Sequence, residues 1–191
     1  MPRPRQFAPD AVLDAAQTVF HARGYEATSV QDLVEATGLS RSSLYATWGD
    51  KHALFLAVLD RYAAAGREAT EAVCGGRSPL SAIRAVLEQS AGGSGCLIVN
   101  AAAECGGRDP ETAARASAAR RALDARFGTL VRQAQASGDI DPDCSAASLA
   151  QFLTGAVYGL RSLQTSGADA GALAAVVEGA LAALRPAARA A

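Results

Sequence analysis

The chain alternates residues that start helices with residues that end them, and this alternation restricts its fold more than any other feature. Ser29 and Asp50 have side chains that accept free backbone N–H groups at a helix start, and apolar residues at helical spacing follow each of them. Gly24 and Gly38 each follow a stretch with helical spacing of apolar residues, and glycine at such a position commonly ends a helix. The β-branched residues are scattered singly and not in the alternating runs of a strand. The sequence therefore predicts an all-α fold.

Nine helices are expected, as a compact three-helix head and a larger helical body. We expect them over residues 10–24, with Asp10 as the cap, 29–38, 40–48, 50–75, 78–92, 96–104, 109–138, 149–160 and 173–184. A chain of 191 residues can bury a substantial core as one large domain or as two small ones. We place the head within residues 1–50 and the body within residues 51–191.

Composition gives no sign of a nucleic-acid partner. The formal net charge is only −1, and the first fifty residues have no basic excess, so a DNA-binding role has to rest on local arrangement. No apolar stretch is long enough to cross a bilayer, and the first residues lack the apolar core of a signal peptide. We therefore expect a soluble, cytoplasmic protein with no membrane partner.

The cysteine pattern does not indicate a metal site. The four cysteines are widely spaced without a C-x-x-C motif, and only two histidines could supplement them. We expect reduced thiols, no structural metal and no cofactor. The residues concerned are Cys74, Cys96, Cys105, Cys144, His21 and His52.

Residues 29–48 have the pattern of two short helices joined by a three-residue turn. Gly38 suits a left-handed turn, Leu39 fills the corner, and Ser40 caps the next helix. An inner apolar seam is expected from Leu33, Val34, Leu39 and Leu44. The outward side chains would then be Arg41, Ser42, Ser43, Tyr45, Thr47 and Lys51. Such donors suit phosphates and base edges in a major groove, although a pair of short helices can also be purely structural.

Two strings in this region closely resemble the signature of the TetR family of transcriptional regulators. They are GYEATSVQDL, residues 24–33, and TGLSRSSLYATWGDKHAL, residues 37–54. The resemblance covers about the first 55 residues, while the body resembles the family only in length and helix pattern. It implies a non-enzymatic repressor that binds double-stranded operator DNA as a dimer and is released by a small effector.

The resemblance also implies roles for single residues. Arg41 would read guanine, because its fork matches O6 and N7 in the major groove. Thr28 and Lys51 would anchor phosphates beside helix N-termini, where the helix dipole favours an anion. Further contacts to base edges, thymine methyl groups or backbone are expected from Ser42, Ser43, Tyr45 and Thr47.

Two further pairs of residues bear on these contacts, Thr47 with Trp48 and Arg3 with Arg5. The family often has an aromatic residue or His at the position of Thr47, and Phe at the position of Trp48. Trp48 is expected to keep the role of a buried aromatic residue. Thr47 differs from the usual residue, so the phosphate contact made from this position in the family is not assured here. Arg3 and Arg5 could reach along DNA as a flexible arm, or they could belong to a solvated tail.

The last two helices have broad apolar faces rich in small residues such as Gly155, Gly159 and Gly179. The width of these faces, together with the family resemblance, favours a four-helix interface in a homodimer. The alternative is that both faces only close the core of the monomer.

A pocket for the effector is expected inside the body, among the fourth to eighth helices. Few charges fall on the inner faces, so a largely apolar ligand oriented by a few polar groups is expected. The candidate lining residues are Leu87, Cys96, Leu97, Ile98, Asn100, Ala101, Glu104, Phe127, Val131, Phe152 and Tyr158. Each of them could equally be an ordinary core residue.

The segment GCLIVNAAAE, residues 95–104, resembles a motif found in one branch of the TetR family. Some members of that branch respond to electrophiles or oxidants through a cysteine. Cys96 would lie at a helix N-terminus, which makes a thiolate more available. Alternatively, Cys96 is a small residue packed behind Gly95. A disulfide between Cys96 and Cys105 would require the helix to break.

Two other classes of protein, an enzyme and a structural oligomer, fit the sequence less well than a regulator. An enzyme would need a catalytic set, but the sequence offers no Ser/His/Asp arrangement, phosphate-binding loop or metal cluster. A purely structural helical oligomer would not explain the outward Arg and hydroxyl side chains of the third helix. The regulator is therefore the preferred interpretation.

Overall fold

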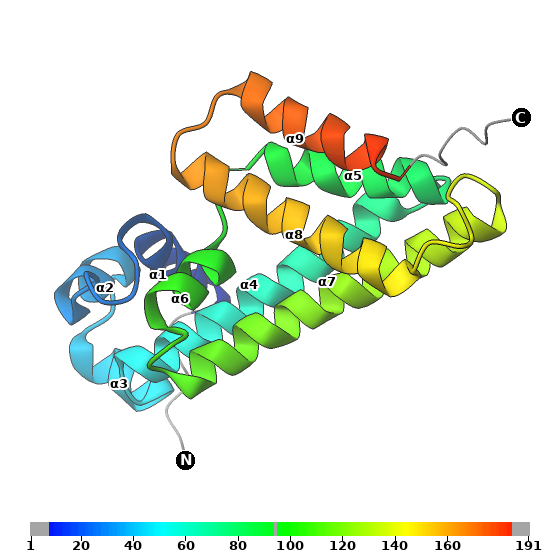
Figure 1. Ribbon diagram of the computed structural model, residues 1–191. Coiled ribbons are helices and arrows are strands. Elements are labelled where there is room, and N and C mark those ends of the chain that lie inside the picture. Colours follow the sequence, from blue (N-terminus) through cyan, green and yellow to red (C-terminus); the bar gives the residue numbers. More distant parts are fainter. Residues whose placement is uncertain (1–7, 94, 185–191) are drawn as a thin grey trace, which may run out of the picture.

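The computed structural model describes residues 8–93 and 95–184, which fold into nine helices and no strand, as the sequence predicts. The helices are α1 (Pro9–Arg23), α2 (Val30–Thr37), α3 (Arg41–Trp48), α4 (Lys51–Cys74), α5 (Pro79–Ala91), α6 (Leu97–Cys105), α7 (Pro110–Ala136), α8 (Ala146–Thr165) and α9 (Ala170–Ala182). Helices α1 to α3 form the head at one end of the molecule. The long helices α4 and α7 run from the head to the far end of the body, where α5, α8 and α9 lie (Figure 1).

The caps confirm the predicted starts of the second, third and fourth helices. The Ser29 hydroxyl accepts the backbone N–H of Asp32 at 3.1 Å, and the Asp32 carboxylate accepts the N–H of Ser29 at 2.8 Å, which makes a reciprocal capping box. Ser40 caps α3, and Asp50 caps α4 by accepting the N–H of Ala53 at 2.7 Å. These caps set the directions of the three helices that surround the turn.

The predicted cap of the first helix is wrong. Helix α1 begins at Pro9, with Ala8 at the capping position and no side-chain cap. Pro9 lacks an N–H and has its backbone angle fixed near the helical value, so it can start the helix two residues earlier. The Asp10 carboxylate instead accepts a hydrogen bond from Arg61 of α4 at 2.8 Å.

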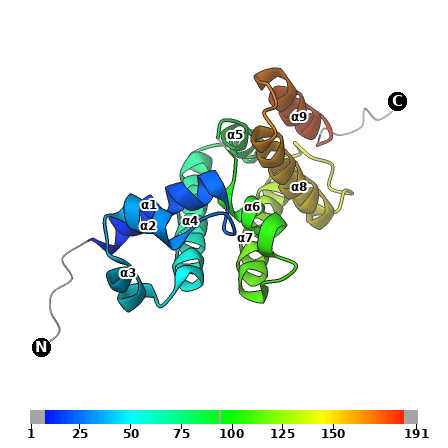
Figure 2. The same ribbon diagram turned by 90° about the vertical axis from the view of Figure 1, so that its left-hand side faces the viewer.

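One apolar cluster joins the head to part of the body. Phe20, Leu33 and Leu44, from the three head helices, are almost fully buried against Phe55 of α4. The same cluster also contains residues of α6 and the first half of α7: Leu97, Ile98, Ala101 and Ala116. Helix α6 lies beside the head in Figure 2 and packs on α1, α4, α7 and α8. The head is therefore held to the body by a shared core.

A second apolar cluster fills the far part of the body. It contains the fully buried side chains of Leu87, Phe127, Leu153 and Leu160, from α5, α7 and α8. Helix α9 packs on α5 and α8 through its own buried leucine and valine side chains. None of the helices in the described ranges combines the length and hydropathy needed to cross a membrane.

Candidate functional site

The turn between α2 and α3 fixes which face of α3 points outward. Gly38 has φ 67° and ψ 8°, the left-handed conformation predicted for it, which ordinary side chains rarely adopt. Leu39 packs against the head core, and Leu44 of α3 is buried in it. With Leu44 anchored inward, the opposite face of α3 lies on the surface, and Arg41 and Ser42 are exposed there.

The outward face of α3 holds a compact set of hydrogen-bond donors. The Arg41 guanidinium lies 5.4 Å from the centre of the Tyr45 ring, and no carboxylate of the described residues pairs with it. The Ser40 hydroxyl lies 2.9 Å from those of Ser42 and Ser43. Arg41 thus presents an uncompensated positive charge beside small hydroxyl groups.

Thr47 and Lys51 border this face. The Thr47 hydroxyl donates to the Ser43 carbonyl at 3.0 Å. The Lys51 ammonium lies 4.4 Å from the centre of the Tyr25 ring, at the N-terminus of α4, where the helix dipole favours an anion. Burial, followed by nearby acidic groups, raises the pKa of Tyr25, so its ring stays neutral beneath the ammonium.

The structure contradicts the predicted phosphate contact of the Thr28 side chain. Its side chain is only 1% exposed, and its hydroxyl donates to the Gly24 carbonyl at 2.6 Å. The turn between α1 and α2 folds this side chain inward, so it is not available to anchor a phosphate. Arg3 and Arg5 lie outside the described residues.

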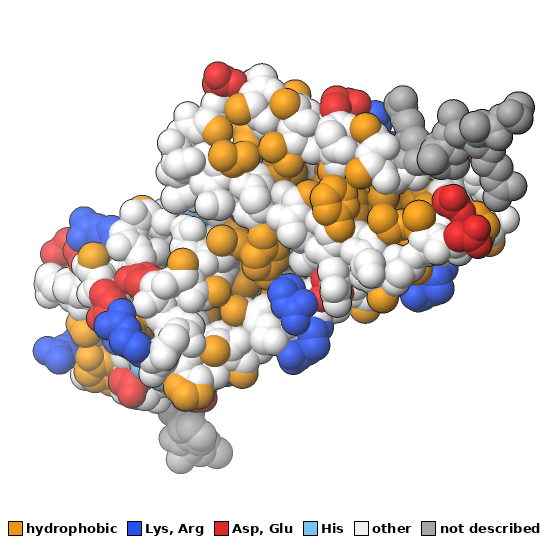
Figure 3. All heavy atoms as spheres, viewed as in Figure 1, with side chains coloured by type: hydrophobic (Ala, Val, Ile, Leu, Met, Phe, Trp, Pro, Cys, Tyr) orange, Lys and Arg blue, Asp and Glu red, His pale blue; other side chains and the backbone are white. Residues whose placement is uncertain are grey.

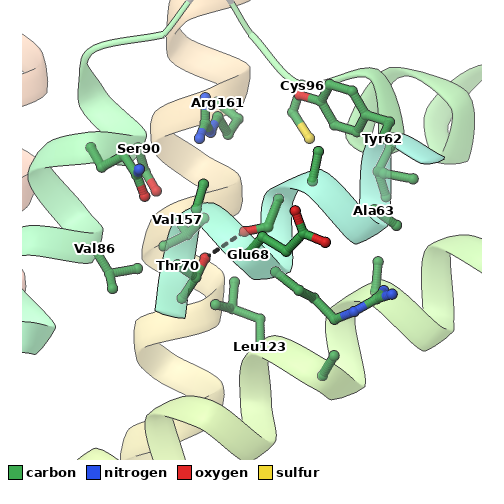
Figure 4. A pocket seen from close by; sticks show the side chains of 18 of the residues that line it. Tyr62, Ala63, Glu68, Thr70, Val86, Ser90, Cys96, Leu123, Val157 and Arg161 are labelled. Carbon is green, nitrogen blue, oxygen red and sulfur yellow. Dashed lines mark hydrogen bonds between the residues drawn. The ribbon is translucent and has the colours of Figure 1, made fainter. Parts of the chain in front are cut away.

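A cavity of about 980 Å³ lies in the body and opens along the exposed middle of α4 (Figure 4). Its volume is at the upper end of the range of about 300–1,000 Å³ usual for small-molecule sites. Six helices supply its lining residues, which are Gln17 of α1, Tyr62, Ala63, Ala65, Gly66, Arg67, Glu68, Ala69, Thr70 and Glu71 of α4, Val86, Gln89 and Ser90 of α5, Ile98 and Val99 of α6, Ala119, Ala122, Leu123 and Arg126 of α7, Val157, Tyr158 and Arg161 of α8, and Cys96 before α6.

Three of the predicted pocket residues line this cavity: Cys96, Ile98 and Tyr158. The other eight do not. Leu87, Phe127 and Val131 lie in the body core, and Leu97 and Ala101 lie in the cluster shared with the head. Asn100 is a half-buried residue of α6 outside the lining, and Glu104 contacts the head. Phe152 is 45% exposed on the outer face of α8. Helical periodicity places these residues on apolar faces, but it does not show which faces border a void.

The charged residues of the cavity were missed from the sequence. Arg161 lies three residues after Tyr158 on α8, so both occupy one face of that helix. A charged residue in an otherwise apolar helix was a signal that could have found it. Arg126 also lines the cavity and pairs with Glu71 of α4 at 3.1 Å.

The phenol groups of the cavity remain protonated at neutral pH. Burial, with the neighbouring Cys96 thiol, raises the pKa of Tyr62 to about 12. Burial also raises the pKa of Tyr158, again with Cys96 as the next cause. Cys96 is a half-buried free thiol beside Tyr62 (Figure 4), while Cys105 is a buried free thiol, so the two form no disulfide.

A carboxylate of α6 connects the body to the head. Glu104 accepts the backbone N–H of Tyr25 at 2.9 Å and that of Glu26 at 2.8 Å. The Glu104 carboxylate can approach this loop closely because residue 24 is glycine. A Cβ at this position would lie 2.7 Å from the carboxylate. Movement of α6 would therefore act directly on the loop between α1 and α2.

Comparisons with known proteins identify the family. Residues 12–58 match the model of bacterial regulatory proteins of the TetR family, and residues 77–180 match that of the tetracyclin repressor-like C-terminal domain. The chain belongs to the TetR family. As a TetR-family protein it is a DNA-binding transcriptional regulator and not an enzyme.

Individual TetR-family relatives cover nearly the whole chain. The HTH-type transcriptional repressor ComR of Escherichia coli K12 is 34% identical over 87% of this chain and 84% of ComR. A cysteine mutant of the TetR family regulator CifR, complexed with 26-base-pair double-strand operator DNA, is 32% identical, with a TM-score of 0.83 over 97% of this chain and 100% of that chain. A TetR-family regulator from Cytophaga hutchinsonii, 18% identical, shares the fold with a TM-score of 0.84 over 93% of this chain and 94% of its own.

Proposed function

We propose that this chain is a transcriptional repressor that binds double-stranded operator DNA as a homodimer in the cytoplasm and leaves the DNA when a small effector enters the cavity. Residues 1–50 would bind the DNA, and residues 51–191 would bind the effector and the second protomer. The observation that carries the proposal is the outward face of α3, where Arg41 is exposed, unpaired with any described carboxylate and flanked by hydroxyl groups.

The arrangement of α3 suits a major groove. An arginine can donate two hydrogen bonds to guanine, and serine hydroxyls can reach base edges or phosphate. Lys51 lies at the start of the next helix, where it can bind a phosphate without reading sequence. The relative CifR, seen with operator DNA, supports this choice of partner.

The outer faces of α8 and α9 support a homodimer. Gly155 and Gly159 of α8 and Gly179 of α9 have no other heavy atom within 4 Å of where a Cβ would lie, so a second helix could approach closely. Phe152 stands exposed on α8, and apolar side chains gather over α8 and the edge of α9 (Figure 3). Pairing these faces would bury the apolar surface and set the two α3 helices about 34–36 Å apart, one turn of DNA.

The lining of the cavity supports release by an effector. It includes Gln17 of the head and a long stretch of α4, which runs from the head into the body. A ligand that prefers one arrangement of these helices shifts the population toward it by its difference in affinity for the two states. If the preferred arrangement spaces the heads wrongly, the affinity for DNA falls.

An electrophoretic mobility shift with the DNA flanking the gene of this chain tests the proposal. A repressor should give a retarded band that resists unrelated competitor DNA and weakens as salt rises. Sedimentation of the free protein should show a dimer. Binding that does not distinguish the flanking DNA from unrelated DNA would contradict the proposal.

A further inference from the structure

One end of the cavity presents the guanidinium of Arg161, a group that only donates hydrogen bonds. Arg161 reaches this end from α8, beside Tyr62 and Cys96 (Figure 4). Among the described residues, the only hydrogen-bond acceptor of its guanidinium is the Gly95 carbonyl, at a long 3.3 Å. Nearby, the Gln164 side-chain oxygen accepts the N–H of Gly95 at 3.3 Å, while its buried Nε2 has no partner among the described residues. A ligand at this end should therefore be an acceptor.

The charge at this end is positive and uncompensated. No carboxylate of the described residues forms an ion pair with Arg161, whereas Arg126 farther along the wall pairs with Glu71. The remaining lining carboxylate, Glu68, belongs to the exposed stretch of α4 where the cavity opens. An anion would be favoured here, partly shielded from water.

Part of the cavity wall is an apolar surface supplied by three helices. Val86 of α5 and Val157 of α8 are buried side chains that face the cavity, and Leu123 of α7 completes this surface (Figure 4). A ligand that filled the space would bury hydrocarbon against these residues while its polar group stayed near Arg161. The cavity therefore combines a cationic end with an apolar body.

We propose that the effector is an amphipathic organic acid whose anionic group binds Arg161 and whose apolar part lies along Val86, Leu123 and Val157. This inference rests on the proposed function, because it names the class of molecule that would release the repressor. Tyr62 stays a hydrogen-bond donor at neutral pH and supplies a second contact to the acid group.

Two fluorescent probes with the same aromatic body separate charge from hydrophobicity. 8-Anilinonaphthalene-1-sulfonate carries an acid group, and N-phenyl-1-naphthylamine lacks it. Wild-type protein should bind the sulfonate about tenfold more tightly than the neutral amine, with one site per protomer, because a charge-assisted hydrogen bond contributes on that scale. Equal affinity for the two probes would overturn the inference.

Substitutions at Arg161 assign this preference to one residue. Arg161→Gln should remove the preference for the sulfonate and leave binding of the amine intact, and Arg161→Lys should restore part of the preference. The matched control is Arg132→Gln, which removes an exposed guanidinium of α7 outside the cavity lining and should change neither affinity. Since the ratio of the two affinities is the readout, general damage to the fold cannot imitate the result. An unchanged ratio in Arg161→Gln would overturn the inference.

An experiment on release from DNA distinguishes this inference from the proposed function. Decanoate and decan-1-ol, which share a chain length, are added to the complex of the protein with its flanking DNA. Release by decanoate at concentrations about tenfold below those needed with decan-1-ol supports both. DNA binding with equal release by the two compounds overturns the inference alone. A sulfonate preference without any DNA binding supports the anion site and overturns the proposed repressor.

Discussion

The carboxylate of Glu104 accepts the backbone N–H of Tyr25 at 2.9 Å, which ties the end of α6 to the loop between α1 and α2. The second carboxylate oxygen accepts the N–H of Glu26, so one side chain satisfies two donors of the head. Both bonds join segments almost eighty residues apart in the sequence. Glu104 is therefore a point at which the body holds the head in one orientation.

Replacement of the Glu104 carboxylate should destabilise the protein and weaken the link between α6 and the head. Glu104→Ala leaves two backbone N–H groups without their acceptor, so the free energy of unfolding should fall by about 1–3 kcal/mol in a denaturant titration. Glu104→Gln keeps one acceptor oxygen and should lose less. Glu35→Ala, at an exposed position of α2 whose carboxylate bonds only Gln31 in the same helix, is the control. A loss in Glu104→Ala no larger than in Glu35→Ala would contradict the role.

Asp109 predicts a pH dependence of stability. The Thr112 hydroxyl and the His52 ring donate to its carboxylate and lower the pKa of Asp109 from 3.8 to about 2. A carboxyl whose pKa is lower in the folded state stabilises the fold above its unfolded pKa, and this contribution is lost as pH falls toward the folded value. Asp109→Asn should therefore melt at a lower temperature than wild type at neutral pH.

This difference in melting temperature should shrink as pH falls from about 4 to about 2, the interval between the two pKa values of Asp109. Thermal denaturation followed by circular dichroism across this range measures it. Asp143→Asn, in the exposed loop before α8, serves as a control without a His partner. A constant difference between wild type and Asp109→Asn would show that the hydrogen bonds to the ionised Asp109 carboxylate do not cause the destabilisation.

Arg41 and Lys51 should respond differently to mutation if one reads sequence and the other binds phosphate. Arg41→Ala should cost about 1–3 kcal/mol on the preferred operator and relax the preference at one base pair. Lys51→Ala should weaken binding to every sequence alike and reduce the slope of affinity against salt by about one. Fluorescence anisotropy with a set of single-base operator variants measures both effects. Identical responses to all variants would contradict this division of roles.

A charge at the outer face of α8 should break the proposed dimer. Phe152→Asp places a carboxylate at the exposed apolar position and should weaken association by about 2 kcal/mol or more, as seen by sedimentation equilibrium. Ala125→Asp adds the same charge at an exposed position of α7 and should leave association unchanged. If both variants stay as dimeric as wild type, another surface forms the interface.

The sequence predicts the helices of this protein better than it predicts the cavity. Caps such as Ser29 and Asp50 act within three residues, so the local sequence contains both partners of each bond. The cavity depends on how six helices meet, and its Arg161 faces a loop some seventy residues away. The prediction for Thr28 was wrong for a related reason, because the inward orientation of its side chain depends on the path of the whole turn between α1 and α2.

The exposure of Arg41 and Ser42 was predictable because the buried Leu44 defines the opposite face of a short helix, whereas Tyr45, also predicted to face outward, is half-buried against the head core. Phe152 shows the limit of this reasoning. An apolar residue on an amphipathic helix can face the core or an external surface, and only the packing of the neighbouring helices decides between them.

The apolar cluster that continues from α1 and α2 into α6 has a consequence for protein engineering. Leu97 and Ala101 of α6 complete the interior of the head, so the DNA-reading unit is not a detachable module. A chimera that exchanges residues 1–50 with those of a relative would set foreign side chains against these two positions. Grafting a new operator specificity onto this scaffold therefore requires the donor's α6 surface as well, or else substitutions confined to the solvent side of α3.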